Sequence, residues 1–188
     1  SMAIIFGFQL LVPQPERTTI TDEQTNGESL VDLSIKKPST NLLVDRSEKI
    51  NETGRVVFDN SKIKGSINLK GGIIDDLILE EFTETLDPTS DLIEFLNPEG
   101  SDNAYHVYTG WLSSDSTIKL PNSDSIWIAD KSSMDVNSPV KLTWTSDQNI
   151  TFEKIISLDE NYLFNVDQRV VNNSGLSFDL YPYGLSKR

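Results

Sequence analysis

Hydrophobic and polar residues alternate along short stretches of the C-terminal part of the chain. Over residues 62–70 every second position is apolar or glycine, and the residues on this face are Ile63, Gly65, Ile67 and Leu69. Residues 140–145 repeat the pattern, with Val140, Leu142 and Trp144 on one face. Because successive side chains of a strand point to opposite faces, this period of two predicts half-buried β-strands.

Four further runs, residues 125–130, 150–158, 162–171 and 176–183, have the residue types of strands. Clusters of turn-forming residues separate these runs, at 121–124, 147–149, 159–161 and 172–175. Short strands separated by such turns are typical of antiparallel sheets packed face to face. The sequence therefore predicts an all-β fold, an antiparallel β-sandwich, over residues 53–188.

Residues 73–82 do not follow the alternation. Their apolar side chains recur at intervals of three and four residues, at Ile73, Ile74, Leu77, Ile78 and Phe82. Periodicity alone predicts an amphipathic helix here. We treat the segment as a strand only because of the family resemblance described below.

The N-terminal part of the chain has a different composition. Ser1 and Met2 are interpreted as a tag scar. Residues 3–12 are apolar apart from one Gln, and Pro13 and Pro15 end the run. A span of the bilayer needs about 20 apolar residues, so we predict that residues 1–13 contain the outer end of a transmembrane helix. A signal-peptide core and a buried strand remain alternatives.

Residues 14–52 are rich in Thr, Ser, Asn and charged residues, with few apolar side chains. Such a composition buries too little apolar surface to offset the entropy of ordering. We predict a flexible polar linker. The predicted organisation is therefore 1–13, 14–52 and a β-sandwich domain at 53–188.

The chain is acidic, with 16 Lys and Arg against 29 Asp and Glu and a formal net charge of −13. Residues 1–54 hold 5 basic and 8 acidic residues, and residues 55–188 hold 11 and 21, so the folded part carries most of the charge. Such a surface repels nucleic-acid phosphates and anionic lipid head groups. The absence of cysteine excludes thiolate catalysis and Cys-ligated metal sites.

Candidate catalytic or metal-binding residues are few. His106 is the only histidine, between Tyr105 and Val107, and we predict a packed strand residue rather than a general base or metal ligand. The carboxylate pairs at 75–76 and 80–81 lack the alternating ligands and glycine of a calcium loop, which favours a solvated acidic edge.

The three tryptophans, Trp111, Trp127 and Trp144, suggest either an aromatic platform for sugars or core packing. Each lies beside aliphatic residues in a strand-like run, so we predict core packing. The residues therefore predict no catalytic, cofactor-binding or metal-ligating site, no cofactor, and a protein that is not an enzyme.

Several motifs together resemble a known family. Residues 57–79, VFDNSKIKGSINLKGGIIDDLIL, resemble the start of the large periplasmic domain (P1) of YidC-type membrane protein insertases of Gram-negative bacteria. Further similar motifs follow in the family's order, at 108–111, 137–140, 142–144, 159–162, 170–173 and 180–184. The ordered set extends over residues 57–184, most of the predicted domain.

The resemblance implies a β-supersandwich similar in topology to galactose mutarotase, placed on the periplasmic side of the bacterial inner membrane. It implies a domain for interaction and spacing in an insertase that inserts and folds membrane proteins, alone or with the Sec translocon. The implied partners are the SecD–SecF complex and nascent membrane proteins. The family's working groove, with its membrane-buried arginine, lies in C-terminal helices that have no counterpart here, so no site residue is carried over.

The family domain is longer than the part of this chain after Arg55. We therefore expect exposed apolar sheet edges near residues 176–185. The alternative function is a carbohydrate-binding or mutarotase-like β-sandwich. Mutarotation needs a general acid and a general base, and the mutarotase family uses histidines with a carboxylate, whereas this chain has only His106.

Overall fold

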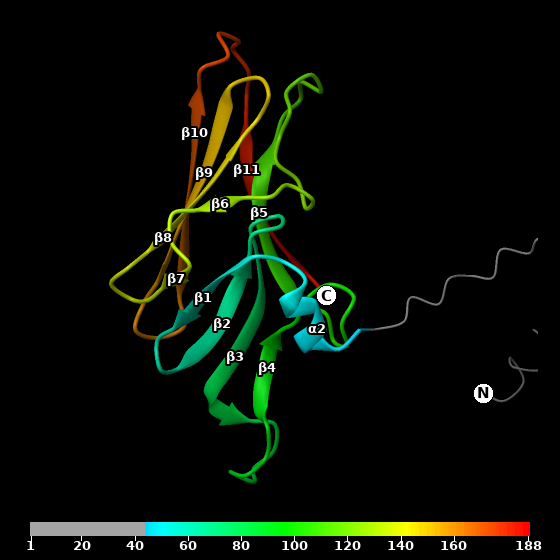
Figure 1. Ribbon diagram of the computed structural model, residues 1–188, viewed down its shortest axis with the longest axis vertical. Coiled ribbons are helices and arrows are strands. Elements are labelled where there is room, and N and C mark those ends of the chain that lie inside the picture. Colours follow the sequence, from blue (N-terminus) through cyan, green and yellow to red (C-terminus); the bar gives the residue numbers. More distant parts are fainter. Residues whose placement is uncertain (1–43) are drawn as a thin grey trace, which may run out of the picture. The chain divides into compact units, whose positions relative to one another are not determined.

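Residues 44–188, the part of the chain that the computed structural model describes, fold into two β-sheets packed as a sandwich (Figure 1). The seven-stranded sheet contains β1 (Arg55–Asp59), β2 (Ile63–Asn68), β3 (Ile73–Thr83), β4 (Leu92–Leu96), β5 (His106–Leu112), β7 (Ser133–Met134) and β11 (Tyr181–Lys187). The four-stranded sheet contains β6 (Ile128–Ala129), β8 (Val140–Thr145), β9 (Ile150–Leu158) and β10 (Phe164–Asn172). The predicted all-β sandwich is confirmed.

The strand order is β11-β5-β3-β2-β1-β7 in the larger sheet, where β4 pairs with β3, and β10-β9-β8-β6 in the smaller one. All strand pairs are antiparallel except β1 with β7. Consecutive strands pair at β1–β2–β3–β4 and at β8–β9–β10, as expected for segments joined by short turns.

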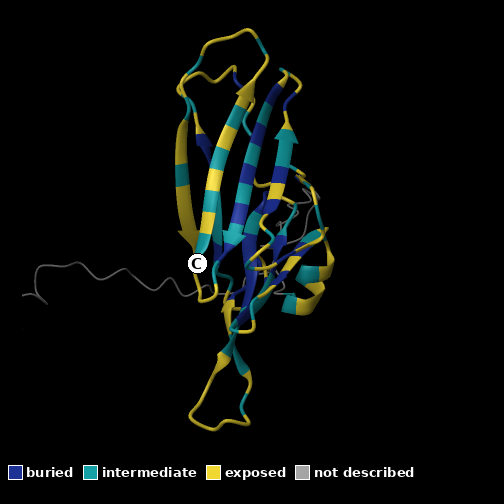
Figure 2. Ribbon diagram, turned by 90° about the vertical axis from the view of Figure 1, so that its left-hand side faces the viewer, coloured by how far each residue is buried: buried dark blue, intermediate teal, exposed yellow. Residues whose placement is uncertain are grey.

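The core lies between the two sheets and is built from alternating inward side chains. In β9 every second residue is buried, and Figure 2 shows the strands that line the core as the most buried parts of the molecule. Val140, Leu142 and Phe152 have no exposed surface. Removing such apolar surface from water contributes about 25 cal/mol per Å², which makes this layer the main source of stability.

Strand β3 explains why residues 73–82 have a helical period in the sequence. Ser66 pairs with Asp76 and Ile67 pairs with Ile74, so Asp75 is an extra residue that forms a β-bulge. The bulge restarts the alternation, so Ile74 and Leu77, three residues apart, both join the core. A bulged strand therefore imitates the spacing of an amphipathic helix, and the strand assignment is confirmed.

Helix α2 (Arg46–Asn51) precedes β1 and overlaps the predicted linker. The Asp45 side chain caps it by accepting a hydrogen bond from Ser47 N at 2.8 Å. Residues 44–52 are therefore structured where a flexible linker was predicted. Few apolar side chains are available to stabilise this segment, and the ion pair between Arg46 and the sheet stabilises it instead. The rest of the predicted linker and the predicted membrane segment at 1–13 lie outside the described residues.

None of the helices in the described part of the chain has the length and apolar character needed to cross a membrane.

Strand β11 forms one edge of the larger sheet and pairs with β5. It begins at Tyr181, so the strand predicted from residue 176 starts five residues later and continues to Lys187. Leu176, Tyr181 and Leu185 are 52%, 57% and 53% exposed, which confirms the exposed apolar residues expected near 176–185.

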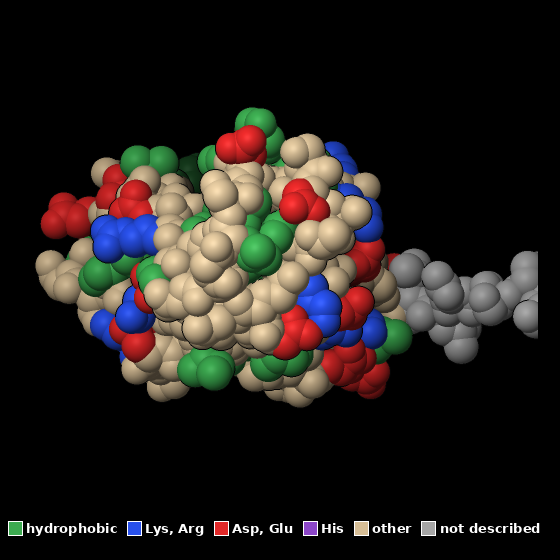
Figure 3. All heavy atoms as spheres, turned by 90° about the horizontal axis from the view of Figure 1, so that it is seen from above, with side chains coloured by type: hydrophobic (Ala, Val, Ile, Leu, Met, Phe, Trp, Pro, Cys, Tyr) green, Lys and Arg blue, Asp and Glu red, His purple; other side chains and the backbone are tan. Residues whose placement is uncertain are grey.

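The two ends of the sandwich differ in form. The β3–β4 hairpin extends away from the sandwich at the lower end of Figure 1. Figure 3 views the opposite end, where Lys and Arg side chains lie beside Asp and Glu and hydrophobic side chains form small separate groups.

Candidate interaction surface

His106, the first residue of β5, is 7% exposed, and its Nδ1 atom has no hydrogen-bond partner among the described residues. The packed strand histidine predicted from the sequence is confirmed. The imidazole lies in the wall between two clefts, one polar and one lined by Tyr108 and Tyr183. Within residues 44–188 no group of three or more His, Asp or Glu side chains is placed to hold a metal ion.

Asp75 and Asp76 are not part of a solvated edge, which corrects the prediction for this pair. They are 4% and 7% exposed, because the β-bulge brings both into contact with cations. Arg55 forms an ion pair with Asp75, and Arg46 of α2 forms one with Asp76. Ser66 Oγ joins the two pairs, since it donates to Asp76 Oδ2 at 2.5 Å and accepts from Arg55 Nε at 2.6 Å.

The second carboxylate pair behaves as predicted. Glu81 is exposed, and Glu80 is partly exposed and pairs with Lys64 at 2.8 Å between Nζ and Oε1. In contrast, burial raises the pKa of the Asp75 carboxyl, and the charge of Arg55 lowers it in part. Four charged side chains that are buried or largely buried, Arg46, Arg55, Asp75 and Asp76, are therefore engaged with one another as structural pairs. We call them the paired charge network.

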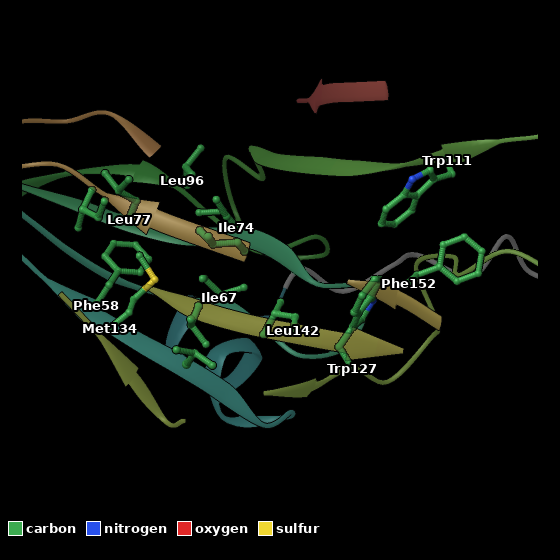
Figure 4. Close-up of a cluster of buried hydrophobic side chains, with 14 of the residues drawn as sticks. Phe58, Ile67, Ile74, Leu77, Leu96, Trp111, Trp127, Met134, Leu142 and Phe152 are labelled. Carbon is green, nitrogen blue, oxygen red and sulfur yellow. The ribbon is translucent and has the colours of Figure 1, made fainter. Parts of the chain in front are cut away.

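The tryptophans pack in the core, as predicted. Trp111 and Trp127 stack with ring centroids 6.4 Å apart, and Phe152 contacts the Trp111 ring edge-on at 5.1 Å (Figure 4). Trp144 is partly buried and packs against Phe152 at 5.7 Å between centroids. Their faces contact protein side chains, so they do not form an open platform.

A buried lysine between the sheets was missed in the sequence. Lys154 of β9 is 1% exposed, and its Nζ atom donates to the carbonyl oxygens of Gly72 at 3.1 Å and Gly71 at 3.4 Å. The ammonium also lies over the rings of Trp127 and Tyr108, 4.8 and 5.1 Å from their centroids. Burial lowers the pKa of Lys154 to about 7.

The sequence did contain a signal for this residue. Lys154 occupies the inward register of β9, between Phe152 and Ile156, where each neighbour on the same face is apolar. A lysine at such a position is either exposed at a strand edge or buried with unusual partners. Here the Gly71–Gly72 turn of the other sheet brings carbonyl groups to the amine, and Gly72 adopts a φ of +60° in that turn.

An apolar pocket of about 430 Å³ lies at the base of the β3–β4 hairpin. Its lining comes from β2, β3, β4 and the β9–β10 turn, and consists of Ile63, Leu77, Leu79, Phe82, Phe95 and Tyr162. Phe82, Phe95 and Tyr162 are 48%, 49% and 42% exposed. The Tyr162 hydroxyl donates to Glu81 Oε2 at 2.6 Å, which holds the turn against the hairpin.

This pocket could not be recognised from the sequence, because its residues come from four separate elements. The sequence pattern shows that Ile63, Leu77 and Leu79 point to one face of the sheet. It does not show how far the smaller sheet extends over that face. The β9–β10 turn ends the cover at Tyr162, and the surface beyond it stays open. An open apolar pocket at a sheet end is the strongest candidate for a binding surface in the described part of the chain.

Comparison with known proteins identifies the family. Residues 55–188 match the family described as the YidC periplasmic domain. The protein of Rickettsia canadensis named membrane protein insertase YidC is 36% identical over 193 residues, which cover 100% of this chain and 34% of the relative. The Pelagibacter ubique protein of the same name is 35% identical over 189 residues, with 98% and 34% covered. This chain spans about a third of the length of these curated relatives, and it belongs to the YidC periplasmic domain family.

Proposed function

We propose that this chain is the periplasmic part of a membrane protein insertase of the bacterial inner membrane, and that it acts by binding and positioning rather than by turnover. The observation that carries the proposal is the family match over residues 55–188, together with relatives named as insertases that align with the whole chain. The chain covers only 34% of the length of those relatives, so the insertion activity of the whole protein is proposed for it rather than shown.

The fold supports a role in positioning. Helix α2 lies at the end of the predicted linker, and the ion pair between its Arg46 and Asp76 of β3 ties it to the larger sheet. This ion pair connects the segment before β1 to the sheet, which is the connection that a positioning role requires. The proposed partners are the SecD–SecF complex and nascent membrane proteins, which the domain would hold close to the site of insertion.

The experiment uses the complete gene product in cells whose own insertase can be depleted. Insertion of a reporter membrane protein is measured by protease protection after depletion, with and without the complete gene and with a version that lacks residues 55–188. We expect the complete gene to restore insertion and the shortened version to restore it less well. With a reporter whose insertion is lost on depletion, failure of the complete gene to restore insertion would contradict the proposal.

Partner contact is tested in the same cells with a photo-crosslinking amino acid at exposed positions. We expect crosslinks to SecD or SecF, identified with specific antibodies, from some positions on the domain and none from residues of the core. The alternative carbohydrate-binding function is tested by calorimetric titration of the chain with simple hexoses. Measurable, saturable heat would favour that alternative.

A further inference from the structure

The apolar pocket adjoins an unpaired strand edge. Among the described strands β4 pairs only with β3, so its other edge offers backbone groups for further pairing. Phe95 of β4 and Phe82 of β3 line the pocket, and each is about half exposed. Natural sheets protect open edges of this kind, or they use them to bind extended peptides.

The β3–β4 hairpin itself is acidic, and the cations near it come from other segments: Lys64 pairs with Glu80, Arg46 lies 3.7 Å from Glu94, and Lys62 lies over the Tyr162 ring. Residues 71–118 contain eleven Asp and Glu and no Lys or Arg, and the β3–β4 hairpin lies within them. Glu84 and Asp91 face each other across the hairpin, with Glu84 N donating to Asp91 O at 2.9 Å, and neither carboxylate forms an ion pair with a described residue. The opposite end of the molecule, in contrast, carries both signs side by side (Figure 3).

We propose that the pocket and the free edge of β4 bind an extended polypeptide segment in which apolar side chains alternate with Lys or Arg. The apolar side chains enter the pocket between Phe82, Phe95 and Tyr162, and the basic ones face the acidic hairpin. The inference rests on the proposed function, because it assigns to the domain one class of polypeptide that it would hold.

The chemistry of the surface selects this occupant over two others. A second copy of the chain would bring an equally acidic hairpin to the same place, and like charges repel. An anionic lipid surface is repelled for the same reason. A basic segment is attracted, and its strand form matches the spacing of alternate side chains on a sheet edge.

The test measures binding of a dye-labelled peptide of about eight residues that alternates leucine and lysine, a length suited to one strand. Fluorescence anisotropy is followed as the 188-residue chain is added. We expect saturable binding that weakens as salt is raised, because opposite charges are screened. A leucine–glutamate peptide and a serine–lysine peptide should each bind at least about tenfold more weakly, since each lacks one of the two attractions.

Two variants locate the binding. Phe95→Ser should weaken binding of the leucine–lysine peptide by about tenfold or more, as loss of a central aromatic contact does. Ile128→Ser is the matched control, because Ile128 is 74% exposed on β6 of the other sheet, and it should leave binding unchanged. Glu84→Gln together with Asp91→Asn should reduce both the affinity and its dependence on salt. Thermal unfolding confirms that each variant is folded.

Equal binding of the leucine–glutamate peptide, or unchanged affinity in the Phe95 variant, would overturn the proposal. Binding to vesicles of anionic lipid that Phe95→Ser abolishes would assign the surface to a membrane, and sedimentation that shows a Phe95-dependent dimer would assign it to a second copy. Both results would also overturn it. If peptide binding fails while the complete gene still restores insertion, this inference falls and the proposed function stands. If insertion does not depend on the gene, the proposed function falls whatever the peptide does.

Discussion

The two sheets bury charge in two different ways. On the larger sheet the paired charge network sets two arginines against two aspartates, with Ser66 between them. Between the sheets Lys154 is more completely buried, yet its partners are carbonyl groups and aromatic rings. The comparison shows that this fold tolerates a buried charge either by neutralising it with an opposite charge or by surrounding it with dipoles.

The two solutions differ in how they respond to protons and to mutation. A buried pair is costly to break, because removal of one partner leaves the other charged in a poor solvent. A lone buried lysine is costly to keep, and the cost appears as a lowered pKa. Substitution of one partner in the paired charge network should therefore destabilise the protein, whereas replacement of Lys154 by an apolar residue should stabilise it.

The largest effect is expected from Arg55→Met. The Arg55 and Asp75 side chains are 7% and 5% exposed, so the substitution leaves a buried carboxylate unpaired and should destabilise the protein by about 3–5 kcal/mol near pH 7. Chemical denaturation measures it. Lys64→Met, which breaks the more exposed pair with Glu80, is the control and should have a much smaller effect, because a surface ion pair contributes little. Equal costs for the two variants would mean that the network contributes no more than a surface pair.

The next effect has the opposite sign. Lys154→Met keeps most of the side-chain volume and removes the buried amine, so at pH 6 we expect a gain in stability of about 1–3 kcal/mol. The loss of two hydrogen bonds to Gly71 and Gly72 limits the gain. Lys141→Met, an exposed lysine on β8, is the control. A loss of stability in Lys154→Met would show that the carbonyl and aromatic contacts outweigh the cost of burying the charge.

The pH dependence of the wild-type protein separates the two sites further. The pKa of Lys154 is about 7 in the folded state, below the ordinary value of 10.5 that applies when unfolded. The unfolded state therefore binds more protons between these values, and stability from this group rises with pH across that window, by at most about 1.4 kcal/mol per pH unit. Urea denaturation at several pH values should show this rise in the wild type and in Lys141→Met. A slope of the same size in Lys154→Met would assign it to another group.

The sequence predicted these features unequally. The alternation in β8 and β9 reports burial directly, because a strand without bulges keeps its period of two. In β3 the extra residue Asp75 breaks that period, and nothing local to the sequence announces a bulge. The burial of Asp75 depended on Arg55, twenty residues earlier, and the open pocket depended on where the β9–β10 turn ends. Features that need contacts between distant segments were therefore the ones that the sequence could not supply.

The smallest effect is expected at the cap of α2 and tests how far the paired charge network extends. Asp45→Ala removes the side chain that accepts from Ser47 N and should destabilise the protein slightly, whereas Asp45→Asn keeps an acceptor and should have less effect. Loosening α2 weakens the hold of Arg46, but Asp76 keeps its hydrogen bond from Ser66, so its carboxylate is not left without a partner. Chemical denaturation compares both variants with Arg55→Met. A cost in Asp45→Ala as large as that of Arg55→Met would show that α2 is an integral part of the network, and that the segment before β1 stabilises the sheet.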